Sequence, residues 1–180
     1  MGVEQRLPLP VLDQAAHPHP GPEDWTYSSF GTIMAQWHGY KLVNGRSTKP
    51  PISLLVQRDI WRLKVHHLTS PTTVGETLFN PPAYQPGVWN NFDLRISWST
   101  ADRPGALRLL RNDEEWVHHV GVNTYHQSVD GHVPIKMPYF KVGLYRASWN
   151  PNKDYEYETG GPDVVVYHDA VEVGTWPGRV

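Results

Sequence analysis

Short runs of alternating apolar and polar residues recur along this chain, each bounded by clusters of Gly, Pro, Asn or Asp. Such runs are typical of half-buried β-strands separated by turns. No stretch keeps a 3.6-residue apolar period over three turns, and only residues 75–80 are expected to form one helical turn. The predicted strands cover residues 25–38, 52–57, 60–67, 91–99, 105–111, 115–122, 138–147 and 163–173.

Strands at this spacing with no helices between them predict an all-β fold of antiparallel sheets, most simply a β-sandwich or jelly roll. Residues 1–24 are dense in proline and show no sustained period, so an extended arm or an edge strand is expected there. Residues 25–180 are expected to form one jelly-roll domain. Because many unrelated functions use this fold, the function has to be argued from a site.

Composition removes several classes of function. The chain has 180 residues, with 16 Lys+Arg against 18 Asp+Glu for a net charge of −2, which disfavours a nucleic-acid or anionic-membrane binder but leaves a local basic groove open. The absence of cysteine excludes a disulfide framework, a thiolate metal site and a cysteine nucleophile. No apolar run approaches the ~20 residues of a membrane helix, and no signal peptide is evident.

Two predicted strands carry polar faces that suit acid–base chemistry. In residues 31–39 (GTIMAQWHG), alternation assigns Ile33, Ala35 and Trp37 to the core, and to the other face Thr32, Met34, Gln36 and His38. In residues 138–146 (PYFKVGLYR), it assigns Phe140, Val142 and Leu144 to the core, and to the other face Tyr139, Lys141, Gly143 and Tyr145. A glycine inside a strand, such as Gly143, often marks the close approach of a ligand or another backbone.

Taken singly, each polar face is more often an ordinary solvated surface. Together they supply an amide, an imidazole, phenols and an ammonium, which are the groups needed to remove a proton alpha to a carboxylate and to protonate a leaving oxygen. The amide donates hydrogen bonds to a carboxylate that gains enolate character, and the ammonium stabilises a phenolate. This combination indicates β-elimination on a uronic acid.

At these residues the chain resembles the jelly-roll polysaccharide lyases, and most of all the heparin lyase I-like family, which is related to glucuronan and alginate lyases. Segment 36–39 (QWHG) matches a Q-x-H motif, and segment 139–146 (YFKVGLYR) matches a Y-F-K-x-G-x-Y motif. Three further segments agree in order and approximate spacing over residues 25–176: 49–54 (KPPISL), 89–99 (WNNFDLRISWS) and 165–174 (VVYHDAVEVG).

The resemblance implies a role for each matched residue. His38 would neutralise the uronate or act as general base, and Gln36 would hold its carboxylate. Tyr145 would be the catalytic acid, or acid and base together, and Lys141 would support its ionisation or bind substrate. The remaining expected substrate contacts are Tyr139, Arg46 and Lys49. Arg46 and Lys49 lie on a predicted loop for which the alternative interpretation is an ordinary solvent-exposed loop. Arg146 and Trp98 are expected to be structural.

The resemblance further implies an acidic polysaccharide substrate such as glucuronan, alginate or a glycosaminoglycan, a secreted monomer and no required cofactor. The family also has an arginine-bearing strand before the Q-x-H strand, whereas only residues 4–7 (EQRL) stand upstream here, a poor match that suggests a shortened member. The alternative of a non-catalytic carbohydrate-binding jelly roll therefore stays open, as does a structural or capsid-like protein.

Other candidate sites are weaker. The pairs His66-His67 and His118-His119 point to opposite faces of a strand, so a zinc site is not expected. Structural calcium at Asp163 and Asp169 is retained as an option, against the reading of ordinary surface aspartates. The neighbours Glu114 and Glu115 would diverge on a strand and so do not suit a retaining glycosidase.

Overall fold

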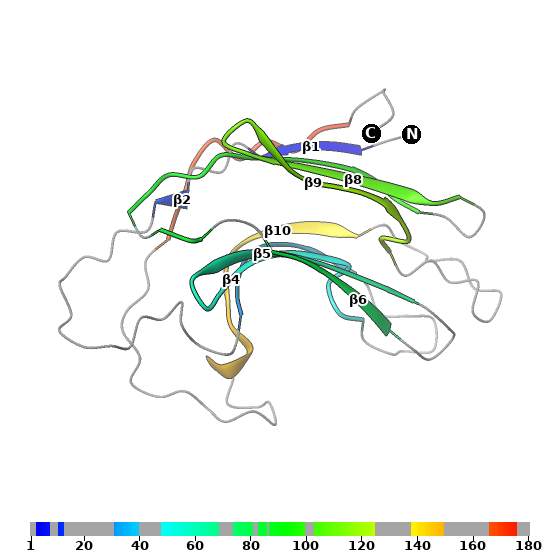
Figure 1. Cartoon of the computed structure of the whole chain (residues 1–180), viewed down its shortest axis with the longest axis horizontal. Coiled ribbons are helices and arrows are strands. Elements are labelled where there is room, and N and C mark those ends of the chain that lie inside the picture. Colours follow the sequence, from blue (N-terminus) through cyan, green and yellow to red (C-terminus); the bar gives the residue numbers. More distant parts are fainter. Residues whose placement is uncertain are drawn as a thin grey trace.

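In the computed structural model, two antiparallel β-sheets pack face to face (Figure 1). The structure describes residues 3–7, 11–12, 31–39, 48–68, 74–80, 83–85, 87–99, 103–124, 138–149 and 166–175. The strands are β1 (Val3–Leu7), β2 (Val11–Leu12), β3 (Thr32–His38), β4 (Ile52–Gln57), β5 (Ile60–Leu68), β6 (Val74–Phe79), β7 (Phe92–Ser97), β8 (Gly105–Arg111), β9 (Glu114–Gly121), β10 (Tyr139–Tyr145) and β11 (Tyr167–His168), and a short 3-10 helix, η3, covers Ala147–Trp149.

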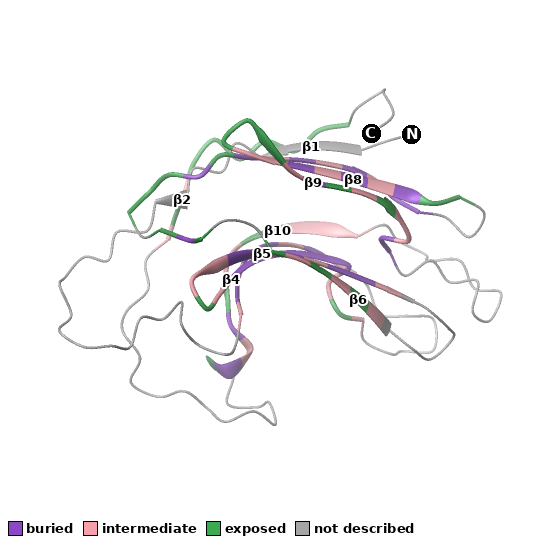
Figure 2. Cartoon of the chain, viewed as in Figure 1, coloured by how far each residue is buried: buried purple, intermediate pink, exposed green. Residues whose placement is uncertain are grey.

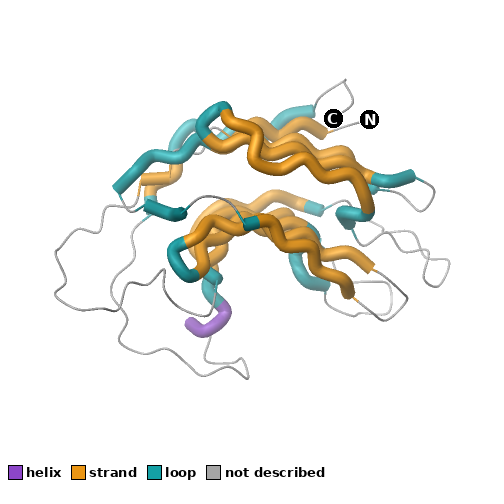
Figure 3. The backbone as a smooth tube through the Cα atoms, viewed as in Figure 1, coloured by secondary structure: helices purple, strands orange, loops and turns teal. Residues whose placement is uncertain are grey.

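The larger sheet has the strand order β10-β3-β4-β5-β6, and the facing sheet has the order β1-β7-β8-β9. A small third pair joins β11 to β2. In Figure 3 the five-stranded sheet bends so that the face turned away from its partner sheet is concave. This outer face of the five-stranded sheet carries the residues of interest.

Tight turns set the register of two hairpins. Arg58 and Asp59 have φ values of 54° and 56° between β4 and β5, and Asn112 and Asp113 have φ values of 51° and 66° between β8 and β9. Two consecutive residues with positive φ suit a two-residue hairpin turn whose twist matches that of the flanking strands. The predicted antiparallel all-β fold is confirmed.

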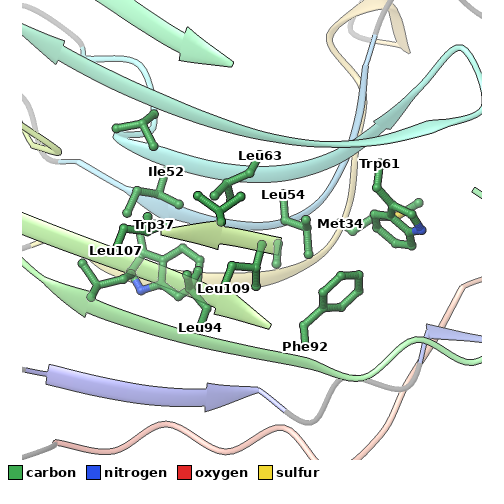
Figure 4. Close-up of a cluster of buried hydrophobic side chains, with 14 of the residues drawn as sticks. Met34, Trp37, Ile52, Leu54, Trp61, Leu63, Phe92, Leu94, Leu107 and Leu109 are labelled. Carbon is green, nitrogen blue, oxygen red and sulfur yellow. The ribbon is translucent and has the colours of Figure 1, made fainter. Parts of the chain in front are cut away.

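The apolar faces of the two sheets meet in one core (Figures 2 and 4). Trp37 and Trp61 are fully buried, and Trp98 is 8% exposed, which agrees with the core position predicted for Trp37 and the structural role expected of Trp98. The rings of Trp37 and Phe140, on adjacent strands, have centroids 4.9 Å apart. Because both residues point into the core, their strand neighbours on either side point outward.

Three local expectations are wrong. Alternation assigns Val142 to the core, but it is 41% exposed, on a strand at the end of the sheet order. Residues 75–80 do not form a helical turn, because β6 pairs along its length with β5, from Leu63 opposite Phe79 to Leu68 opposite Val74. The faces of the first half of β3 are also reversed: Thr32 and Met34 are buried, and Ile33 is only partly buried. Here the register with β4 shifts between Ile33 and Ala35, so that Met34 is an extra residue and the alternation changes phase.

Within the predicted amino-terminal arm, β1 is the outermost strand of the four-stranded sheet in the described order. Arg6 lies opposite Asp93 in that sheet. It is therefore not on the sheet that carries Gln36 and His38, and it does not stand in for the arginine of the family pattern.

Candidate active site on the outer face of the five-stranded sheet

The register of β10 against β3 brings four of the predicted site residues together. Tyr139 lies directly opposite His38, and Lys141 lies directly opposite Gln36. Directly opposed residues of an antiparallel pair point to the same side of the sheet. The intervening pair, Trp37 and Phe140, belongs to the core side, so these four residues share the outer face.

Ring contacts confirm the cluster. The His38 and Tyr139 rings have centroids 5.5 Å apart at an interplanar angle of 41°. The ammonium of Lys141 lies over the Tyr139 ring, with Nζ 5.1 Å from the centroid, within the range of a cation–π contact. The contact that the structure gives Lys141 is thus with Tyr139 rather than with Tyr145.

One ring nitrogen of His38 is committed to the backbone. Nδ1 lies 2.6 Å from the carbonyl oxygen of Gly39, and because a carbonyl only accepts, Nδ1 carries the proton and donates it. In the neutral imidazole, Nε2 then has the free lone pair. His38 is only partly buried, so this lone pair is on a side chain that solvent or substrate reaches, as a general base requires.

Gly39 lets the segment before β4 approach the end of β3 closely. A Cβ at this position would lie 2.6 Å from Thr48 Oγ1 and 3.8 Å from Pro51 Cδ. The segment that leads into β4 therefore packs against the end of β3, which places the exposed Lys49 beside this end of the site. Arg46, the other predicted basic contact, lies outside the described residues.

Tyr145 lies further along the same face. It is opposite Ile33, and its side chain is 42% exposed. Ile33 is three residues from Gln36, which corresponds to roughly 10 Å along a strand. The structure therefore sets Tyr139, and not Tyr145, beside His38.

A bulge separates the two ends of β10. The register shifts between Val142 and Tyr145, and Gly143 has a φ of +135°. Apart from its chain neighbours, no atom of the described residues lies within 4 Å of the place where a Cβ would stand, so the glycine is required by its backbone conformation and not by a close approach. Arg146, just beyond the strand, is 6% exposed with its guanidinium carbon 5.5 Å from the Trp149 ring centroid, in keeping with its predicted structural role.

Sequence reasoning missed a second polar cluster on this face. His66 is 6% exposed; its Nδ1 donates to the Pro50 carbonyl at 2.8 Å, and its Nε2 lies 2.9 Å from Glu76 Oε2. Glu76 Oε1 lies 3.4 Å from Lys64 Nζ. Nothing in the local sequence pairs residues of β5 with β6, so this cluster becomes visible only through the sheet register.

Burial and charge act in opposite directions in this cluster. Burial lowers the pKa of His66, and the nearby Lys49 charge adds to that, although Pro50 and Glu76 favour the charged form. Burial alone would raise the pKa of Glu76, but Lys64 and His66 outweigh it and hold the pKa of that carboxyl below its ordinary value. Glu76 is therefore an anion at neutral pH, stabilised by Lys64, and also by His66 when that imidazole carries a proton on both nitrogens.

The two sheets differ in charge. The described strands of the larger sheet contain three cations, Arg62, Lys64 and Lys141, against the single anion Glu76. Strands β7, β8 and β9 contain equal numbers of each sign, among them the ion pairs Arg95–Asp93 and Arg108–Glu115. A surplus of positive charge therefore accompanies the His38 cluster, which suits an anionic ligand.

Metal sites find no support in the part of the chain that the structure describes. No group of three or more His, Cys, Asp or Glu residues there is arranged to hold an ion. Asp169 accepts a hydrogen bond from the Ala170 amide at 2.7 Å, whereas Asp163 is not among the described residues. Calcium therefore stays a prediction from the sequence. No helix in the described segments is long and apolar enough to cross a membrane.

Comparison with known proteins matches residues 21–172 to the family described as "Polysaccharide lyase". A solved structure, that of endo-β-1,4-glucuronan lyase from the fungus Trichoderma reesei, superposes with a TM-score of 0.67 at 19% sequence identity and covers 96% of this chain and 68% of that one. No curated protein matches by sequence. The family match spans most of the chain, and the fold likeness agrees with it: the chain belongs to the polysaccharide lyase family.

Proposed function

We propose that this protein cleaves an acidic, uronate-containing polysaccharide by β-elimination on the outer face of the five-stranded sheet. The observation that carries the proposal is the cross-strand cluster of Gln36, His38, Tyr139 and Lys141, in a chain of the polysaccharide lyase family. Glucuronan is the first substrate to test, because the structural relative acts on it by name. Membership of the heparin lyase I-like branch and secretion of the protein belong to the same proposal.

The geometry suits the first half of an elimination. Gln36 and Lys141 stand opposite each other and offer an amide donor and a cation to one carboxylate. Stabilising the carboxylate as it gains enolate character makes the neighbouring carbon acid easier to deprotonate. His38 Nε2 then accepts that proton, while Nδ1 stays bound to the Gly39 carbonyl and holds the ring.

Two phenols on this face can protonate the leaving oxygen. The motif assigns that role to Tyr145, and the ring contact with His38 favours Tyr139. Proton removal and leaving-group departure occur at adjacent carbons of one sugar, so the phenol and the base must lie within a few ångströms of the same bond. Both Tyr139→Phe and Tyr145→Phe therefore belong in the first experiment.

The test is ultraviolet absorbance of the unsaturated uronate formed from glucuronan, alginate, heparin, heparan sulfate and hyaluronan. We expect His38→Ala to abolish turnover with the melting temperature preserved. Loss of turnover on Tyr145→Phe alone would support the assignment from the motif, and loss on Tyr139→Phe alone would support the neighbour of His38. Retained turnover in both tyrosine variants would contradict this placement of the site.

The competing function is a non-catalytic carbohydrate-binding module. It predicts affinity for one of these polysaccharides without any new ultraviolet absorbance. Calorimetric titration beside the absorbance assay separates the two functions, because binding without product by well-folded protein would exclude the lyase.

A further inference from the structure

A second cation stands in line with Gln36 across the sheet. Gln36 lies opposite Ser53 of β4, and Ser53 lies opposite Lys64 of β5. With Lys141 on the other side, the outer face carries the row Lys141, Gln36, Ser53 and Lys64. Ser53 is short and buried, so nothing long intervenes from the strand between Gln36 and Lys64.

The spacing of this row suits a polymer of anionic sugars. Neighbouring strands lie about 4.8 Å apart, so the backbones at Gln36 and Lys64 are separated by roughly 10 Å. A chain that crosses the strands with one carboxylate at Gln36 and Lys141 would present a further carboxylate near Lys64. The side chain of Lys64 is 26% exposed, which leaves its ammonium accessible from this face.

Lys64 already has an internal counterion that a substrate can replace. Glu76 Oε1 lies 3.4 Å from Lys64 Nζ, and Glu76 also contacts His66 Nε2 through its other oxygen, at 2.9 Å. Glu76 is 38% exposed, and ion pairs at such exposure are weak. If Lys64 turns toward a substrate carboxylate, Glu76 keeps its place beside His66 Nε2, which donates to it when the imidazole carries both protons, and its 38% exposed side chain stays in contact with solvent.

We propose that Lys64 binds a further carboxylate of the same polyuronate chain whose first carboxylate is held at Gln36, and that Glu76 is the internal counterion which this further carboxylate displaces. The inference rests on the proposed function, since it requires a polyuronate on the same face. It makes Lys64 a substrate-binding residue and makes Glu76 a competitor of the substrate.

The two partners of one ion pair are therefore expected to act in opposite directions on binding. We would titrate an oligoglucuronate into the His38→Ala protein, which keeps the ligand intact, and measure Kd by calorimetry at low salt. Lys64→Met should weaken binding about tenfold, and Lys64→Arg should restore most of it. Glu76→Gln should tighten binding by roughly threefold, because it frees the ammonium while it breaks the same ion pair.

Matched controls are available on the other sheet. The Arg108–Glu115 pair is an exposed ion pair of the same kind, with side chains 40% and 42% exposed. Arg108→Met and Glu115→Gln should leave Kd within a factor of about two if the effect belongs to the Lys64 row. A melting curve for every variant records the structural cost of breaking each pair.

Distinct outcomes overturn distinct claims. If the wild-type protein cleaves a polyuronate and Lys64→Met binds as tightly as its parent, the inference on Lys64 fails and the proposed function stands. If Glu76→Gln weakens binding as much as Lys64→Met does, the pair is only structural. If wild-type protein yields no unsaturated product but the Kd values shift as expected, the lyase fails and the binding row stands. Absence of binding by the His38→Ala parent overturns the inference on Lys64, and absence of both binding and wild-type product overturns the proposed function as well.

Discussion

Replacement of Gly143 by alanine tests whether the bulge in β10 is required by the backbone. Gly143 has a φ of +135°, in a region that residues with a side chain rarely adopt. Beyond its chain neighbours, a new Cβ would meet no atom within 4 Å in the part of the chain that the structure describes, so no steric clash there contributes. The cost is then the conformational strain alone, about 1–3 kcal/mol. For a domain of this size, that corresponds to a fall in melting temperature of roughly 2–12 °C.

The same substitution should affect turnover. The bulge lies between Lys141 and Tyr145. If the backbone at residue 143 relaxes to a conformation that alanine prefers, the side chain of Tyr145 therefore moves relative to that of Lys141. We expect Gly143→Ala to lose activity beyond what its unfolded fraction explains, measured as absorbance per mole of folded protein after a urea titration. Gly121→Ala is a suitable control, because among the described residues its Cβ would meet the His119 ring, at 3.0 and 3.2 Å, on the opposite sheet. A melting temperature for Gly143→Ala within about 1 °C of the wild type would refute the reasoning.

Three further predictions concern the fold. Trp37, which stands between Gln36 and His38 in the sequence, is fully buried. Trp37→Ala should lower the free energy of unfolding, measured by urea titration, by about 3–5 kcal/mol. A decrease below about 1 kcal/mol would contradict the place of Trp37 in the core. The side chain of buried Asn123 accepts a hydrogen bond from the Ser99 amide at 2.9 Å and donates one to the Ser97 carbonyl at 3.0 Å. Asn123→Ala should therefore lower the free energy of unfolding by about 1–3 kcal/mol and leave the activity per folded molecule unchanged. Loss of that activity would show that the two sheets are coupled. Burial lowers the pKa of His168, and burial together with the charge of His67 lowers the pKa of His119. As the pH falls, the unfolded chain therefore binds more protons than the folded protein. The stability that depends on these two neutral imidazoles is complete above their unfolded pKa near 6.5 and is lost as the pH falls through their lower folded pKa values. Urea midpoints should therefore fall on acidification below that pH, and the double variant His119→Gln, His168→Gln should flatten this dependence; an equal pH slope in the variant would contradict it.

Alternation along single strands was enough to predict the fold class and the shared face of two candidate site residues. It placed Gln36 and His38 on one face because Trp37 between them had to be buried, and the structure agrees. It failed at Met34, because the bulge there depends on the register with β4 and not on the residues of β3 alone. It also failed at residues 75–80, where pairing with β5 outweighs local preference.

Contacts between strands could not be predicted from the sequence, because the register between two strands is not set by the residues of either strand alone. That Tyr139 rather than Tyr145 stands beside His38 follows from which residues of β3 and β10 are opposed, and this offset has no local signal. The Lys64–Glu76–His66 cluster likewise exists only because β5 and β6 align at His66 and Glu76. Candidate residue types could therefore be chosen from the sequence, but their grouping required the sheet.

We propose that the outer face of the five-stranded sheet catalyses β-elimination in polyuronates, with Gln36 and His38 at the reaction centre. The most direct measurement is the initial rate of ultraviolet absorbance increase on glucuronan and the other polyuronates, for wild type, Gln36→Ala, His38→Ala and the control Arg108→Met on the opposite sheet. We predict product from wild type and from Arg108→Met, with a loss of at least about a hundredfold in both site variants and unchanged melting temperatures. Product formed at the wild-type rate by His38→Ala and Gln36→Ala would contradict the account.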